Sequence, residues 1–216
     1  MTRVRGRVGP MVILAVVLAA MPPPAARADV CTHCYSYAVD SSESAYTGVD
    51  VTRYDVRPTN HDAGEIFQSE WVLFTNGWVE LGTDHWSNGT HFWYCVYQAP
   101  GGSWTTVCSH EIKDYAEHDF HIVRSSPLVW DFWVDGTKYR SLTTASELSG
   151  YQVEVGLETY DNAAHVGAYA DGYLMYTANG GGWTYWSGQD GSHVDSSMCG
   201  HWSGPSQWIL AENGPC

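Results

Sequence analysis

Basic residues are scarce in this sequence. Its 216 residues include ten Lys and Arg residues against 24 Asp and Glu residues, a net charge of −14 with neutral His. A field of that sign repels nucleic acid and anionic membrane surfaces, so we expect neither as a partner. Long apolar runs are also lacking after the first 20 residues, and the sequence therefore predicts no membrane-spanning helix in the remainder.

Several well-known motifs are missing as well. The chain has no phosphate-binding loop and no dinucleotide fingerprint. His118 and His121 are three residues apart, a spacing that places them on opposite faces of a strand, so a dedicated zinc site is not favoured. Ser203 occupies the fourth position of a Gly-x-x-Ser-Gly run, where a nucleophile elbow requires the third. We therefore expect no cofactor and no metal.

The first 28 residues have the pattern of a secretory signal peptide. Arg3, Arg5 and Arg7 precede a short apolar core, and Ala26-Arg27-Ala28 forms a small-residue cleavage site. The core is too short to span a bilayer. Cleavage would leave residues 29–216 with six basic and 24 acidic residues, a net charge of −18. We expect a secreted, extracellular protein, one domain, and a monomer.

The six cysteines all follow the predicted leader. An even number of cysteines in an exported chain indicates disulfides. Cys95 and Cys108 flank a Gly-rich turn and are expected to pair across a hairpin. Cys31 and Cys34 are expected to reach Cys199 and Cys216 near the C-terminus, although their spacing also permits a Cys31–Cys34 bridge.

Short runs rich in Tyr, Trp, Val and Thr alternate with Gly, Asn, Asp and Pro, which is typical of an all-β sandwich. Asp135-Gly136 and Asn76-Gly77 are each expected at a type I′ hairpin turn. The predicted strands cover residues 35–39, 48–56, 69–75, 78–84, 91–98, 104–109, 119–124, 129–134, 137–142, 151–160, 166–170 and 172–177.

The composition changes after residue 179. Gly180-Gly181-Gly182 is followed by Trp183, Trp186, Trp202 and Trp208 among Ser, Gly and Gln. Residues 179–216 are therefore expected to form a disulfide-tethered strap on the same domain, with a small aromatic binding appendage as the alternative.

Two glutamates stand out because each has a glycine two residues away in a strand-like run. Side chains alternate along a strand, so Glu80 shares a face with Trp78, Gly82 and Asp84. In the same way, Glu158 shares a face with Glu154, Gly156 and Tyr160. Glycine within a strand often marks a place where something approaches closely. The pattern indicates two carboxylates facing one groove, or else two solvated acids on an exposed face.

These runs resemble segments of the glutamic peptidases, both the eqolisin group and the neprosin-like group. Trp71-Val72 followed by Val79-Glu80-Leu81-Gly82-Thr83 is similar to the eqolisin Trp-Val and Leu-Gln-Thr-Gly segments, and its glutamate is closer to the neprosin-like pattern. Phe92 to Pro100 is similar to an aromatic Trp-Tyr-Glu-Trp-Tyr-Pro strand, and Val155 to Tyr160 resembles Trp-Ile-Val-Glu-Asp-Phe.

The resemblance covers residues 69–177 and implies an antiparallel, two-sheet, concanavalin-like β-sandwich of the jelly-roll type. It implies that Glu80 and Glu158 are the catalytic pair on the concave sheet. The groove residues expected beside this pair are Trp78, Asp84, Trp93, Glu154 and Tyr160. The sequence departs from the eqolisin pattern at Glu80, which replaces a glutamine, at Cys95, which replaces an acid, and at Val155, which replaces a tryptophan.

Three functions are compatible with this pattern. The first is a secreted endopeptidase that acts at acidic pH, in which Glu158 activates water and protonated Glu80 stabilises the oxyanion. The second is a glycoside hydrolase that uses the same two glutamates. The third is a non-catalytic β-sandwich that binds carbohydrate or cell wall. We favour the endopeptidase, with a polypeptide as its substrate.

Overall fold

The computed structural model describes residues 33–54, 65–86, 90–112, 116–160, 169–187, 191–195 and 198–212. Throughout these residues the secondary structure is β-strand, turn and loop, without helix, so none of them forms a helix able to cross a membrane. The predicted signal peptide lies outside them.

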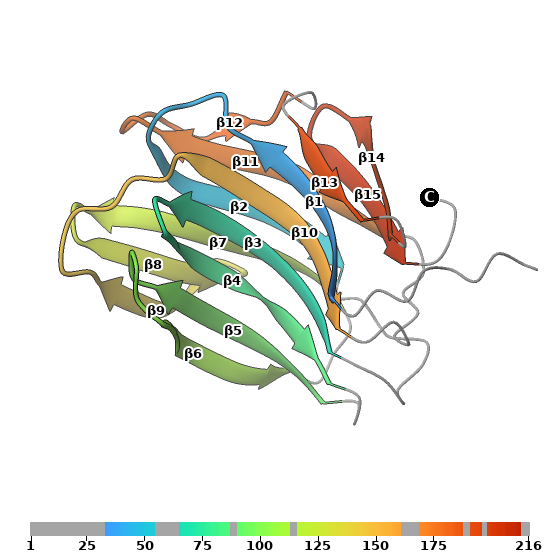
Figure 1. Cartoon of the computed structure of the whole chain (residues 1–216), viewed down its shortest axis with the longest axis horizontal. Coiled ribbons are helices and arrows are strands. Elements are labelled where there is room, and N and C mark those ends of the chain that lie inside the picture. Colours follow the sequence, from blue (N-terminus) through green and yellow to red (C-terminus); the bar gives the residue numbers. More distant parts are fainter. Residues whose placement is uncertain are drawn as a thin grey trace, which may run out of the picture.

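Within the described residues, fifteen strands form two antiparallel sheets that pack face to face (Figure 1). The seven-stranded sheet has the order β13-β1-β10-β3-β4-β5-β6. Its strands are β1 (His33–Asp40), β3 (Ile66–Phe74), β4 (Gly77–His85), β5 (His91–Gln98), β6 (Trp104–Ile112), β10 (Gln152–Tyr160) and β13 (Ser192–Val194).

The eight-stranded sheet has the order β14-β15-β11-β2-β7-β8-β9, and β12 pairs with β11 outside this path. Its strands are β2 (Tyr46–Tyr54), β7 (Glu117–Ser126), β8 (Val129–Val134), β9 (Thr137–Thr143), β11 (Tyr169–Ala178), β12 (Thr184–Tyr185), β14 (Met198–Gly204) and β15 (Gln207–Glu212). The expected all-β sandwich is confirmed.

Alternation along each strand directs apolar side chains into the space between the sheets. Val79 and Leu81 of β4 are buried there, against Phe120 and Ile122 of β7. This leaves the residues at the intervening positions of β4 on the outer face. The core also contains a buried ion pair between Arg53 of β2 and Glu70 of β3, which links the two sheets. A buried charge of this kind requires its partner, because an unpaired one is strongly destabilising.

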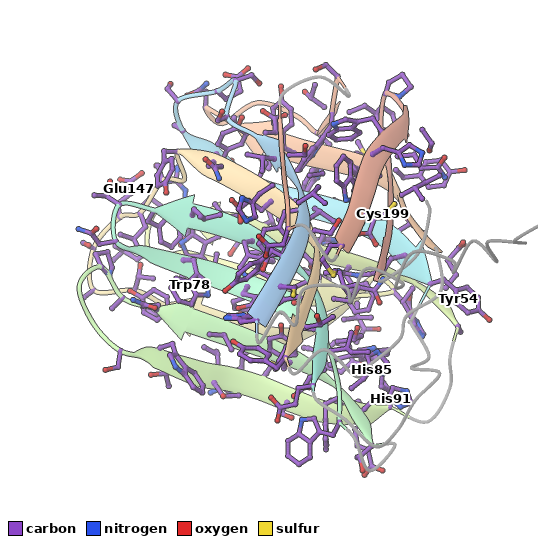
Figure 2. All side chains as sticks on the ribbon, turned by 45° about the vertical axis from the view of Figure 1, so that its right-hand side comes forward. Tyr54, Trp78, His85, His91, Glu147 and Cys199 are labelled. Atoms are coloured by element: carbon purple, nitrogen blue, oxygen red, sulfur yellow. A yellow bond between two sulfur atoms is a disulfide. The ribbon has the colours of Figure 1, made fainter. Side chains whose placement is uncertain are left out.

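Three histidines, His85, His91 and His118, are buried among the described residues. His85 ends β4 and His91 begins β5, and their rings stack at 5.2 Å (Figure 2). Burial and the neighbouring His91 lower the pKa of His85 to about 3. His85 is therefore neutral in the folded protein at any moderate pH.

One hairpin turn matches its prediction and the other is shifted by one residue. Asp135 and Gly136 have φ of 50° and 69°, as a type I′ turn requires. In the β3–β4 hairpin, Phe74 pairs with Gly77, so the central residues are Thr75 and Asn76. Asn76 has φ of 62°, whereas Gly77 already belongs to β4. A Cβ at Gly77 would lie 2.4 Å from a backbone oxygen of the adjacent strand, so any larger residue at this position would collide with that strand.

The Trp-rich segment after residue 179 contributes the short strands β12 to β15. The β14–β15 hairpin extends the eight-stranded sheet through pairing of β15 with β11. Trp186 and Trp208 are fully buried, and Trp202 packs between them. These tryptophans therefore supply the hydrophobic core beneath this segment.

The predicted Cys95–Cys108 disulfide is confirmed, across the β5–β6 pair. Cys34 and Cys199 are each disulfide-bonded, and the Ser36 hydroxyl donates to the carbonyl of Cys199, so β1 and β14 are in contact. Cys31 and Cys216 lie outside the described residues. The predicted tethering of the C-terminal segment by these four cysteines remains a prediction.

Candidate active site

The register of three adjacent strands builds the floor of a groove. On β3, Ser69 pairs with Gly156 of β10 on one side and with Gly82 of β4 on the other. Directly paired residues of an antiparallel ladder point to the same face. The small side chain of Ser69 therefore lies between two glycines, on the face of the sheet turned away from the core.

Both glycines are required by close backbone packing. A Cβ at Gly82 would lie 2.2 Å from the Ser69 hydroxyl oxygen, and one at Gly156 would lie 2.1 Å from the carbonyl oxygen of Ser36. Real Cβ atoms do not approach other atoms so closely. The space left by the glycines is taken by two aromatic rings, because the Tyr94 hydroxyl reaches across Gly82 to bond to Ser69, and Tyr37 Cδ1 would lie 2.8 Å from a Cβ at Gly156.

A cavity of about 450 Å³ lies on this face of the sheet. Glu80 and Glu158 both line it, on the face that alternation assigns to them. The lining residues are His33, Tyr35, Tyr37, Phe67, Trp71, Leu73, Trp78, Glu80, Tyr94, Val96, Trp104, Glu154, Glu158 and Tyr160. The sequence-based placement of the two glutamates in one groove therefore agrees with the structure, while their catalytic role remains to be tested.

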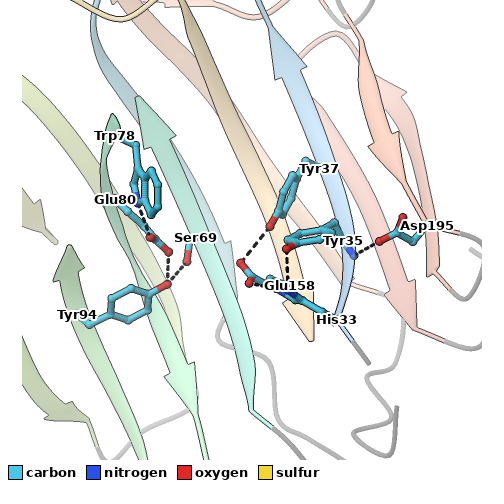
Figure 3. Close-up of polar contacts among 9 residues, drawn as sticks. All are labelled: His33, Tyr35, Tyr37, Ser69, Trp78, Glu80, Tyr94, Glu158 and Asp195. Carbon is cyan, nitrogen blue, oxygen red and sulfur yellow. Dashed lines mark hydrogen bonds and ion pairs between the residues drawn. The ribbon is translucent and has the colours of Figure 1, made fainter. Parts of the chain in front are cut away.

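Glu80 is buried and bound by uncharged donors. The Tyr94 hydroxyl donates to one carboxylate oxygen, and the Trp78 indole N–H donates to the other at 3.1 Å. Ser69 also bonds to the Tyr94 hydroxyl (Figure 3). Burial, and to a lesser degree the charge of Glu158, raise the pKa of Glu80 to about 7, against the opposing effect of these hydrogen bonds. Glu80 therefore holds a proton up to neutral pH.

Glu158 is surrounded by different groups. His33 Nε2 contacts Glu158 Oε1, and the Tyr37 hydroxyl donates to Glu158 Oε2 at 3.1 Å (Figure 3). The Tyr35 hydroxyl lies 2.8 Å from His33 Nδ1. Burial and the charge of Glu158 raise the pKa of Tyr37 well above its usual value, so its hydroxyl remains a donor. Glu158 is therefore held by a histidine at one carboxylate oxygen and by a tyrosine at the other.

Of the other five predicted groove residues, three line the cavity, one lies outside it on the same face, and one lies on the opposite face of the sheet. Trp78, Glu154 and Tyr160 line the cavity. Asp84 shares the outer face of β4 but lies outside the cavity, where its carboxylate accepts a 2.5 Å hydrogen bond from the Trp86 indole. Burial raises the pKa of Asp84 to about 7.

The assignment of Trp93 to the groove is wrong. Trp93 is 8% exposed and packs edge-on against Phe120 and His118 between the sheets. The residues Phe92, Trp93 and Tyr94 are all aromatic, so their chemistry does not reveal which face each occupies. The register resolves it, because Tyr94 pairs with Gly82 and therefore points into the groove.

Several residues of the site were missed from the sequence. His33, Tyr35 and Tyr37 alternate along β1 with Cys34 and Ser36, which are buried on the other face. That alternation is a signal, but it places the residues only within β1. Their proximity to Glu158 depends on the pairing of β1 with β10, more than 100 residues away in sequence.

One group of described residues could hold a metal ion, and it lies outside the groove. Potential ligand atoms of Asp50, Asp119 and His121 are within 4.8 Å of one another. The three residues point away from the core, on the outer face of the eight-stranded sheet, where Asp50 pairs with His121 in register. His121 and His118 occupy opposite faces, as their spacing predicts, since His118 is buried.

The groove therefore contains two carboxyl groups in contrasting environments. Glu80 is buried among neutral donors and keeps its proton up to about pH 7, whereas Glu158 is held by His33 and Tyr37. Such a difference allows one carboxyl group to act as an acid while the other acts as a base.

Known proteins similar to this chain are found by structure and not by sequence. No protein-family model matches the sequence, and no curated protein matches it. A crystal structure of scytalido-glutamic peptidase with a transition state analog inhibitor matches with a TM-score of 0.65 and 11% identity, over 85% of this chain and 99% of that one. SCP-B, a member of the eqolisin family, in complex with the tripeptide Ala-Ile-His, matches with a TM-score of 0.61 and 12% identity, over 84% and 98%. The chain has a glutamic peptidase-like fold.

Proposed function

We propose that this chain is a secreted glutamic endopeptidase that uses Glu80 and Glu158 to hydrolyse peptide bonds. The observation that carries the proposal is that both glutamates line one cavity in contrasting surroundings, where Glu80 is buried among neutral donors with a raised pKa and Glu158 contacts His33 and Tyr37. The solved structures of similar fold, which contain a transition state analog inhibitor and a tripeptide, support a polypeptide as the substrate.

In the proposed reaction, Glu158 accepts a proton from a water molecule as the water oxygen attacks the carbonyl carbon of the scissile peptide. The carbonyl π electrons move to the oxygen, and protonated Glu80 donates a hydrogen bond to this developing oxyanion. Glu158 then gives its proton to the amide nitrogen. The C–N bond breaks, and a carboxylic acid and an amine leave.

The cavity provides the surroundings that this chemistry needs. Tyr94 and Trp78 fix the orientation of Glu80, and burial keeps its carboxyl group protonated. Trp71 pairs with Glu80 in the sheet and lines the same cavity, so it forms an apolar wall beside the carboxyl groups. Restricted access of water strengthens each electrostatic interaction inside the groove.

The raised pKa of Glu80 sets the expected pH range. The proposed mechanism requires Glu80 to be protonated, and its pKa is about 7. Activity is therefore expected at acidic pH and up to neutrality, with a decline above about pH 7. The high acid content of the chain suits activity in acidic surroundings. Secretion through the leader at residues 1–28, and a monomeric state, belong to this proposal.

The direct test is digestion of a denatured protein substrate at acidic and neutral pH, with product peptides identified by mass spectrometry. The wild-type protein should release peptides, and the Glu80→Gln, Glu158→Gln double variant should release none. Glu80→Gln alone is a poor negative control, because an amide at this position can also donate to the oxyanion. Hydrolysis that persists in the double variant would contradict the proposal.

One observation favours a second candidate, a carbohydrate-binding or carbohydrate-cleaving groove. Trp104 and Trp78 both line the cavity, and Trp104 is 63% exposed. Exposed aromatic rings of this kind can stack on sugars. Assays on polysaccharides in parallel with the protein substrate distinguish the two candidates, because the wild-type protein of the second candidate would bind or cleave the polysaccharide and not the protein. The double variant would then retain carbohydrate binding but would lose hydrolysis.

A further inference from the structure

We propose that His33 is a positioning residue for Glu158, and that Tyr35 fixes the imidazole in the required state. This inference rests on the proposed function and assigns roles to two residues for which neither motif nor resemblance predicts one. The geometry that carries it is a chain of contacts from Tyr35 through His33 to Glu158 (Figure 3).

The chain of contacts defines which nitrogen faces Glu158. His33 Nδ1 lies 2.8 Å from the Tyr35 hydroxyl, and Nε2 contacts Glu158 Oε1. When the imidazole is neutral, the Tyr35 hydroxyl donates to Nδ1, and the ring proton is on Nε2. When the imidazole is charged, Nδ1–H donates to the Tyr35 oxygen. In both states an N–H on Nε2 points at the Glu158 carboxylate.

Ring packing holds the imidazole in this orientation. Tyr160 stacks on His33 with ring centroids 3.9 Å apart and planes within 21°. Tyr35 contacts the ring from another side at 4.3 Å. The position of Tyr35 is fixed in turn, because its backbone N–H donates to Asp195 at 2.8 Å. His33 is only one-third exposed, so a rigid packed site replaces most of its solvent contact.

The carboxylate of Glu158 is then held at both oxygens. Oε1 receives the His33 N–H and Oε2 receives the Tyr37 hydroxyl. Tyr160 also hydrogen-bonds to Glu158. The two carboxylate oxygens together have four acceptor positions, so one remains for the attacking water after these three contacts. A general base held in this way needs no reorientation at the moment of proton transfer.

The charged and titratable groups around His33 reinforce this arrangement. On β1 these are Tyr35 and Tyr37, on β10 they are Glu158 and Tyr160, and beside β13 they are His193 and Asp195. Glu154 of β10 and, across the groove, Glu80 complete the set. His193 Nε2 lies 3.4 Å from Asp195 Oδ1, so its carboxylate partner is Asp195. His33 is therefore the basic group in contact with this carboxylate.

The variants that test the role differ in whether they keep a donor. His33→Leu removes the N–H and is expected to lower kcat about 10- to 100-fold with little change in KM. His33→Gln retains an amide N–H near the position of Nε2 and is expected to recover part of kcat. His201→Gln, on exposed β14, is the matched control and should behave as wild type.

A second measurement does not depend on activity. In ¹⁵N-histidine NMR, His33 of the wild-type protein should show the Nε2–H form at alkaline pH, and Tyr35→Phe should shift it toward the other tautomer. His33→Leu with wild-type kcat, while Glu158→Gln is inactive, would overturn the positioning role and leave the proposed function intact. A wild-type His33 in the Nδ1–H form would overturn the role even for a protein without peptidase activity.

Discussion

Glu80 and Glu158 are separated by one intervening strand and by four residues along it, because Glu80 pairs with Trp71 and Glu158 pairs with Phe67 of β3. Ser69 lies midway between these two partners, in the row that contains Gly82 and Gly156. The two carboxyl groups therefore stand diagonally across this row, and the rings of Tyr94 and Tyr37 occupy the space that the two glycines leave.

This arrangement predicts that the floor glycines are needed for both stability and function. Gly82→Ala should lower the free energy of unfolding by about 1–3 kcal/mol, because its Cβ would overlap Ser69. It should also reduce hydrolysis, because displacement of Ser69 would disturb Tyr94, whose hydroxyl bonds to both Ser69 and Glu80. Gly182→Ala is the control, since a Cβ there meets no atom within 4 Å. Urea denaturation of the two variants measures the difference, and equal midpoints would contradict the steric account.

The buried carboxyl group of Glu80 makes stability depend on pH. Its pKa rises from the ordinary 4.5 to about 7 on folding, so the folded state binds the proton more tightly than the unfolded state. The resulting stabilisation is complete below about pH 4.5 and is lost as pH rises through 7. Its size is about 3 kcal/mol. Glu80→Gln should lose this component of the slope between pH 4.5 and 7 in chemical denaturation, and an unchanged slope would count against the raised pKa.

His85 should make the free energy of unfolding depend on pH in the opposite direction. Its pKa falls from 6.5 to about 3 on folding, so the unfolded state binds a proton that the folded state excludes. Stability should therefore fall as pH drops below 6.5, by up to about 1.4 kcal/mol per pH unit. His85→Leu should show a flatter stability curve between pH 6 and 4 than wild type. His201→Leu, at an exposed position, should leave the curve unchanged.

The Cys95–Cys108 bridge closes a short loop at the groove-bearing sheet. In the chain-entropy model a loop of this size contributes about 3 kcal/mol. The Cys95→Ala, Cys108→Ala double variant should therefore unfold at a markedly lower urea concentration. Because Val96, next to Cys95, lines the cavity, peptide hydrolysis should also be more sensitive to temperature in this variant. A double variant as stable as wild type would show that the bridge contributes little to the free energy of unfolding.

The sequence was most informative where polar and apolar residues alternate. In β4 and β10 apolar residues occupy every second position, so the outward face of Glu80 and Glu158 followed from a period of two. The same rule failed at Trp93, because its neighbours Phe92 and Tyr94 are also aromatic and either face was consistent. Strands β12 to β15 were missed because Gly and Ser interrupt any alternation there.

The partners of the two glutamates were beyond sequence reasoning for a different reason. Contacts such as His33 with Glu158 depend on which strands become neighbours, and that choice is made by the packing of the whole sandwich. Burial of Glu80 likewise depends on Tyr94 and Trp78, which come from two strands. The pKa of Glu80 could therefore not be predicted from β4 alone.

The most direct test of the account is the dependence of kcat/KM on pH for the wild-type protein, Glu80→Gln and Glu158→Gln. Wild-type activity should fall above about pH 7 as Glu80 loses its proton. Glu80→Gln should keep measurable activity without that decline, because its amide donates at every pH. Glu158→Gln should lose about 10²- to 10⁴-fold at all pH values, as expected for removal of a general base. Full wild-type activity at pH 8 that is unaffected by Glu158→Gln would contradict the account.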